Sequence, residues 1–129
     1  MKLQLTETEI DKVLLDIFSN GALGELNASG IDYVFNKDNY SKSKVQGNTF
    51  EDNLLSLLKN GGRLKFYDME GGEDTVFLTY DLAKGRLSEV TDTERIQDIK
   101  NILDEDCSAD SWTGYNLIQF LLYGEVIFG

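Results

Sequence analysis

The segment Leu117–Tyr123 constrains the fold most, because as a helix it is apolar on nearly every side. A surface helix carries its apolar side chains in one stripe, whereas a helix without a polar face has to be enclosed by other elements. Asp110 or Ser111 supplies an N-cap in front of this helix, and Gly124 ends it. The sequence therefore predicts a buried central helix against which the rest of the chain packs.

Other segments combine a helical spacing of apolar residues with a capping residue in front of them. Thr6 and Glu9 form a capping box before the first of these helices, and Thr91 or Asp92 caps a later one. The weakest pattern contains Gly85, which lowers helix propensity. The predicted helices span about residues 7–19, 50–60, 81–90 and 92–103.

The clearest strand pattern is an antiparallel hairpin over residues 63–80, in which apolar and polar residues alternate on both sides of a loop. Gly71 and Gly72 in that loop provide the positive φ that a tight connection needs. Short strands are also predicted at Ile31–Phe35 and Val126–Phe128, and the polar segment 37–46 is expected to be a loop. We therefore expect an α+β fold in which a small antiparallel sheet packs against three to five helices, within a single domain of residues 1–129.

The charge of the chain limits its partners. Twelve Lys and Arg stand against 23 Asp and Glu, which gives a formal net charge of −11. Such a surface repels nucleic acid and anionic lipid and favours basic partners, so neither direct nucleic-acid binding nor membrane contact is expected. The N-terminal residues show no secretory signal, and Cys107 is the only cysteine. These features predict a cytoplasmic protein without disulfides.

The sequence lacks the residues that most catalytic mechanisms need. The chain contains no histidine, which removes the usual general base and the common nucleophile pairs. Cys107 stands among acidic residues that raise the pKa of a thiol and make it a poor nucleophile. No glycine-rich phosphate loop precedes a helix. We therefore predict a non-enzymatic protein without cofactors or metals.

Two carboxylate clusters have the composition of a possible site. A calcium loop beginning at Asp104 would need glycine where Ala109 stands and glutamate where Tyr115 stands, so the pattern fails. The acidic residues of segment 68–74 lie at a hairpin tip, where solvent does not raise a carboxyl pKa as general acid–base catalysis requires. A carboxylate-based or metal-assisted enzyme is therefore the least favoured hypothesis.

Two further groups of residues admit alternative interpretations. Lys37, Lys42 and Lys44 are interleaved with aromatic residues (Tyr33, Phe35 and Tyr40), a combination that can bind single-stranded nucleic acid, although a polar loop is the simpler interpretation. Trp112 and Tyr115 precede the apolar part of the last helix. They form either a contact for a partner or a staple of the helix entrance onto the core.

The last twelve residues, Ile118–Gly129, resemble the ending of a family of small proteins encoded by phages and integrated mobile elements. Two further features fit that family, namely an N-terminal helix that runs into Asn20-Gly21 and the stretch Leu78–Gly85. The resemblance implies a setting, that of a phage or mobile-element accessory protein. It carries over no catalytic residue.

Charge and resemblance together favour an acidic protein-interaction module. In its sharpest form it inhibits a basic nucleic-acid-binding host protein by presenting carboxylates to it. The alternative is a regulatory or scaffold module that binds through an apolar patch near the C-terminus. The predicted partner contacts are Asp68, Glu70, Glu73, Asp74, Asp104, Glu105, Asp106, Asp110, Trp112 and Tyr115.

Overall fold

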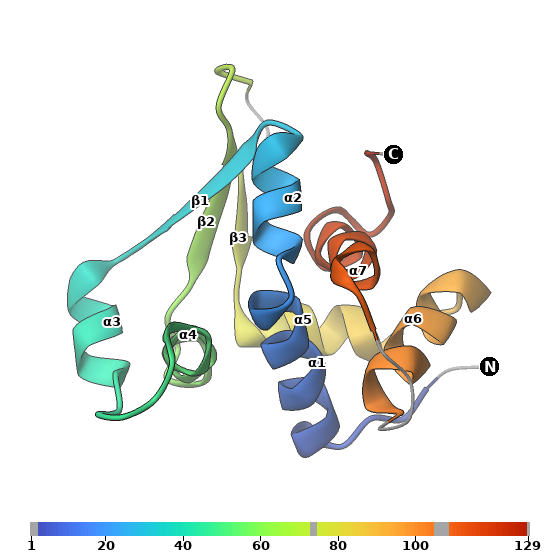
Figure 1. Cartoon of the computed structure of the whole chain (residues 1–129), viewed down its shortest axis with the longest axis horizontal. Coiled ribbons are helices and arrows are strands. Elements are labelled where there is room, and N and C mark those ends of the chain that lie inside the picture. Colours follow the sequence, from blue (N-terminus) through green and yellow to red (C-terminus); the bar gives the residue numbers. More distant parts are fainter. Residues whose placement is uncertain (1–2, 73–74, 105–108, 129) are drawn as a thin grey trace.

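The computed structural model describes residues 3–72, 75–104 and 109–128. Over these residues the chain forms seven helices and a three-stranded antiparallel sheet, which confirms the predicted α+β fold (Figure 1). None of the described helices is long and apolar enough to cross a membrane. In chain order the elements are α1 (Glu7–Ser19), α2 (Ala22–Ala28), β1 (Ile31–Phe35), α3 (Lys37–Ser43), α4 (Phe50–Lys59), β2 (Leu64–Asp68), β3 (Val76–Leu78), α5 (Tyr80–Ser88), α6 (Thr93–Leu103) and α7 (Ser111–Tyr123).

The predicted caps are formed. The Thr6 side chain accepts a hydrogen bond from the Glu9 N–H, and the Glu9 carboxylate accepts one from the Thr6 N–H, which closes the capping box of α1. Asp92 is the N-cap of α6 and Asp110 that of α7. These local signals set the starts of the three helices.

The sheet has the order β1-β2-β3, and β2 pairs with both neighbours. Because side chains alternate along a strand, one face of the sheet is buried and the other is open. Val34, Lys65 and Phe77 stand opposite one another across the three strands and are all exposed. The buried face contributes Ile31, Leu64, Phe66 and Leu78 to the core.

Helix α7 is the centre of the molecule, as the sequence predicts. It packs against α1, α2, α5, α6 and strand β3, and it lies between α2 and α6 in Figure 1. Tyr115 and every residue from Leu117 to Leu122 are buried. This burial includes Gln119, whose polar side chain has no exposed surface.

Three sequence-based expectations about secondary structure were wrong or incomplete. Segment 37–46 is not a loop throughout, because Lys37–Ser43 form α3. Asn36 caps this helix by accepting a hydrogen bond from the Asn39 N–H, and Tyr40 packs its ring against Phe35. The sequence also gave no signal for α2, which follows α1 after a turn at Gly21 with φ of +81°.

Residues Val126–Phe128 form no strand. They are held instead by a side chain, because the Gln119 Oε1 atom accepts hydrogen bonds from the Ile127 and Phe128 N–H groups at 2.9 and 2.7 Å. The three apolar residues in succession here are held to α7 through Gln119 and are not paired with the sheet.

Candidate functional site

The two predicted acidic loops lie far apart. Asp68 ends β2 and Glu70 belongs to the β2–β3 connection, which lies at the top of Figure 1. Asp104 follows α6, whose C-terminal end lies near the bottom. Asp68 uses one carboxylate oxygen to accept a hydrogen bond from the Glu70 N–H at 2.8 Å. The predicted contacts Glu73, Asp74, Glu105 and Asp106, like Cys107, lie outside the described residues. The described parts of these loops therefore do not form one carboxylate stripe.

The remaining predicted contacts have structural roles or are only partly accessible. The Asp110 carboxylate accepts hydrogen bonds from the Thr113 N–H and hydroxyl at 3.0 and 3.1 Å, and these bonds lower the pKa of the carboxyl group. Tyr115 is 2% exposed, and its hydroxyl lies 2.6 Å from that of Ser29, so it belongs to the core. Trp112 is 51% exposed, and its ring centroid lies 5.3 Å from that of Tyr115. Of the pair, only Trp112 remains available to a partner.

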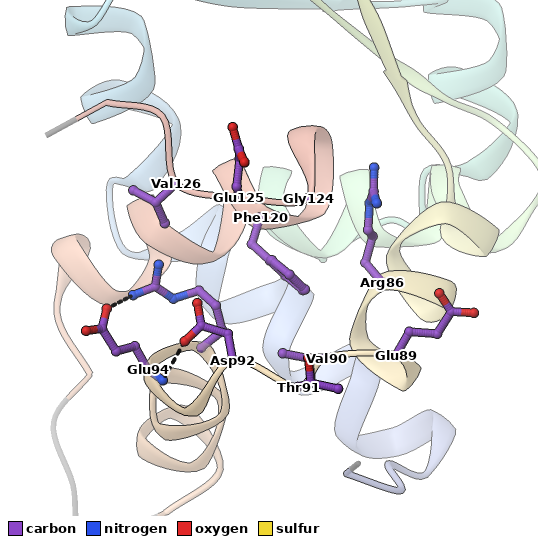
Figure 2. Close-up of a pocket in the computed structure, with 11 residues that line it drawn as sticks. Arg86, Glu89, Val90, Thr91, Asp92, Glu94, Phe120, Gly124, Glu125 and Val126 are labelled. Atoms are coloured by element: carbon purple, nitrogen blue, oxygen red, sulfur yellow. Dashed lines mark hydrogen bonds and ion pairs between the residues drawn. The ribbon is translucent and has the colours of Figure 1, made fainter. Parts of the chain in front are cut away.

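A different acidic site lies where the α5–α6 connection meets the end of α7 (Figure 2). The cleft there has a volume of about 520 Å³. Its position follows from local signals, since Asp92 starts α6 and Gly124, with φ of +77°, ends α7. Its charged lining residues are Arg86, Glu89, Asp92, Glu94, Arg95 and Glu125.

Both arginines of the cleft form contacts with other residues of the chain. Arg86 donates a hydrogen bond from Nε to the Leu121 carbonyl at 3.4 Å, near the C-terminal end of α7 where a cation is favoured. Arg95 is buried and forms ion pairs with Asp98 at 2.9 Å and Glu94 at 3.4 Å. Burial raises the pKa of Asp98, and the Arg95 charge opposes that rise. The charges of Arg86 and Arg95 offset part of the negative charge of the four carboxylates in the lining.

The carboxylates stand around the rim of the cleft. Figure 2 shows Glu94 and Asp92 on the α6 side, Glu89 on the α5 side and Glu125 beyond α7. The ring of Phe120 points into the space between them and is 9% exposed. Glu89 and Glu125 are exposed, and the Glu94 side chain is 80% exposed, so its charge remains available although it touches Arg95.

This arrangement is suited to a positively charged side chain. Carboxylates on a rim attract a lysine or arginine, and an aromatic ring below them adds a cation–π contact. The described residues contain no group of three or more carboxylate, cysteine or histidine side chains placed to hold a metal ion. The described lining of the cleft therefore combines four carboxylates and two arginines with one aromatic ring.

Sequence reasoning did not identify this cleft. Glu89, Asp92 and Glu94 are close in sequence, but a short acidic stretch next to a helix start has the appearance of ordinary capping. Glu125 and Phe120 come from another helix and its continuation, and only the packing of α7 against α5 and α6 brings them to the same cleft. The sequence held no signal for that juxtaposition.

We compared the chain with known proteins by sequence and by structure. No protein-family model, no curated protein and no solved structure matches this chain.

Proposed function

We propose that this chain is a non-enzymatic acidic interaction module that binds a basic segment of another protein through the cleft between α5, α6 and α7. The observation that carries the proposal is the rim of carboxylates above the Phe120 ring. The net charge of −11 supports it, because that field speeds the encounter with a basic surface. The module acts in the cytoplasm.

The narrower form of the proposal concerns the kind of partner. Surfaces rich in lysine and arginine are typical of nucleic-acid-binding proteins. A module that covers such a surface competes with nucleic acid and inhibits the partner, which fits the phage or mobile-element setting implied by the last twelve residues. The contact is assigned to the cleft and not to the two acidic loops, because the described parts of those loops lie at opposite ends of the molecule.

The test is affinity capture of partners from a lysate of the source cells, with stepwise elution by salt. The wild-type protein is compared with the triple variant E89K/E94K/E125K, which reverses three rim charges and leaves the Asp92 cap intact. We expect a basic partner that elutes at moderate salt and is absent from the variant. We also expect added protein to inhibit the nucleic-acid binding of that partner.

A matched control reverses three exposed carboxylates away from the cleft, in the variant E25K/E70K/D81K. Both variants have the same net charge, so a difference between them reports position and not total charge. If the control captures the partner and the rim variant does not, the result supports binding at the cleft. If both variants lose the partner equally, the result contradicts binding at the cleft.

An apolar cleft favours the scaffold alternative. It has a volume of about 580 Å³ and lies between the sheet and the C-terminal segment, where Ile31, Val76, Tyr123, Ile127 and Phe128 line it together with Asp68 and Thr75. Ile127 is 52% exposed. A partner that resists elution by salt and is lost on substitution of Ile127 by serine would support this second function in place of the first.

A further inference from the structure

The basic residues of this acidic chain are concentrated in one part of it. Residues 31–65 carry six Lys and Arg against four Asp and Glu, whereas the rest of the chain carries six against nineteen. These residues run from β1 through α3 and α4 into β2. At physiological salt a charge is screened beyond about 8 Å, so a ligand bound here experiences mainly this local charge.

Two adjoining clefts in this region have no Asp or Glu among the described residues that line them. One, of about 360 Å³, lies at the open sheet face and is lined by Val34, Arg63, Lys65 and Phe77 among others. The second, of about 390 Å³, lies between α3 and the α4–β2 turn and contains Lys42. Because Asn39 lines both, the two clefts are neighbours, and we refer to them together as the basic groove.

The open face supplies cations and an aromatic ring together. The Arg63 guanidinium lies 4.1 Å from the centroid of the Phe77 ring, and Phe77 is 39% exposed. Lys65 stands directly opposite both Val34 and Phe77 across the sheet. Asp32 lies on the same face of β1 as Val34, and its carboxylate accepts hydrogen bonds from the Tyr67 hydroxyl at 3.4 Å and the Tyr33 N–H at 2.8 Å.

We propose that this groove binds single-stranded nucleic acid, with Lys42, Arg63 and Lys65 contacting phosphates and a base stacking on the Arg63–Phe77 pair. Single strands are bound without sequence preference by grooves that combine cations with stacking surfaces, and an arginine plane serves as such a surface. The expectation from the net charge was the opposite. The local charge favours an anionic ligand here, because no Asp or Glu is among the described residues that line the groove.

The same cations would also attract an acidic peptide, but two observations favour nucleic acid. The three cations are spread over two neighbouring clefts, an arrangement that suits the successive phosphates of a strand. In addition, the exposed ring carries a guanidinium above it, which offers a flat charged surface for a base rather than a pocket for an aliphatic side chain. The site is separate from the acidic cleft and shares no lining residue with it.

The experiment is a fluorescence-anisotropy titration of the full chain into labelled twelve-nucleotide oligo-dT and oligo-U in 50 mM NaCl. We expect saturable binding. Because each phosphate contact on a single strand contributes about 0.7 to the slope of log affinity against log salt, three contacts predict about a tenfold loss on going to 150 mM. Absence of saturable binding to both oligonucleotides at 50 mM would overturn the proposal.

Variants separate the groove from general charge effects. R63E/K65E is expected to bind the oligonucleotides at least tenfold more weakly. R63Q/K65Q, which adds no negative charge, is expected to show most of the same loss of affinity. Phe77→Ala removes the stacking ring and is expected to lose about fivefold or more. The control K84E/K100E makes the same charge change at exposed lysines of α5 and α6.

Thermal unfolding of each variant checks that it is folded. The proposal is overturned if the control loses as much affinity as R63E/K65E, or if Phe77→Ala binds like the wild type. It is also overturned if labelled poly-glutamate binds the groove more tightly than either oligonucleotide, since that result would assign the groove to an acidic peptide.

Discussion

At the scale of single residues, Gln119 joins the central helix to the segment that follows it. Its side chain accepts two backbone hydrogen bonds from residues 127 and 128 and donates one to the Tyr115 carbonyl at 3.3 Å. The side chain is fully buried, so water cannot replace these bonds. One polar side chain therefore does for the C-terminal segment what a strand partner would otherwise do.

Replacing Gln119 by leucine should destabilise the protein by about 1–3 kcal/mol, because two partly buried N–H groups lose their acceptor while the side-chain volume stays similar. Urea unfolding followed by circular dichroism measures the change. The control, Gln97→Leu, alters an exposed glutamine of α6 and should change stability by less than about 0.5 kcal/mol. A leucine variant at position 119 as stable as the wild type would show that the hydrogen bonds of the Gln119 side chain contribute nothing to stability.

A second residue-scale prediction concerns Asp16, in the last turn of α1. Burial raises the pKa of its carboxyl group above the ordinary value of 3.8, and a negative charge near a helix C-terminus is unfavourable. Because the folded pKa lies above the unfolded one, the charged form destabilises the fold at neutral pH. Asp16→Asn should therefore raise stability by about 0.5 kcal/mol at pH 7.

The gain from Asp16→Asn should shrink as the pH falls through the folded pKa and vanish below the unfolded value near 3.8, where the wild-type carboxyl group is protonated in both states. Urea unfolding of both proteins at pH 7, 5 and 3 measures this. A difference that stays constant over that range would assign the effect to packing and not to charge.

At the scale of elements, α2 and α7 approach closely because Gly114 has no side chain. A Cβ atom at Gly114 would lie 3.0 Å from the Ala22 Cβ and 3.6 Å from the Ile17 Cα. Glycine at one helix and alanine at the other allow α7 to contact both α1 and α2. The position of the central helix therefore depends on small residues as well as on large apolar ones.

Gly114→Val should destabilise the protein by about 1–3 kcal/mol, because the added methyl groups force α2 and α7 apart. Gly85→Ala is the informative contrast. Gly85 also lies within a helix, but nothing stands within 4 Å of an added Cβ, so the higher helix propensity of alanine should stabilise by up to about 1 kcal/mol. In thermal unfolding we expect Gly114→Val to lower the melting temperature and Gly85→Ala to raise it. A lower melting temperature for Gly85→Ala would contradict the argument.

At the scale of the whole molecule, negative charge is in large excess, but no Asp or Glu is among the described residues that line the basic groove. A net charge of −11 repels itself and destabilises the compact state. Specific pairs offset part of this repulsion. Lys59 lies 3.2 Å from Glu7 and also pairs with Asp11, which in turn accepts a hydrogen bond from the Tyr80 hydroxyl at 2.8 Å. Burial and this bond raise the pKa of Tyr80 to about 12.

The melting temperature should rise with NaCl between about 20 and 500 mM, because salt screens the self-repulsion more than it weakens the few ion pairs. Differential scanning calorimetry measures the shift. The variant E89K/E94K/E125K, with six fewer net negative charges, should show a smaller rise. A melting temperature that falls with salt would mean that pairs such as Lys59 with Glu7 outweigh the repulsion.

Sequence alone determined the elements that carry strong local signals. The capping box of α1, the aspartate caps of α6 and α7, and the alternation in the hairpin each depend on residues a few positions apart. The continuous apolar pattern of α7 likewise required a central position, because no other place excludes water from all its sides. The α+β class followed from these features.

Tertiary structure decided the remainder, because the remainder depends on residues far apart in the chain. Helix α3 is polar and short, and it is stabilised by the Asn36 cap and the rings around Tyr40 rather than by its own periodicity. The acidic cleft joins Glu94 to Glu125, and the basic groove joins Lys42 to Phe77, across elements that only packing brings together. Composition determines the sum of the charges, but which charged side chains share a cleft is a property of the folded chain.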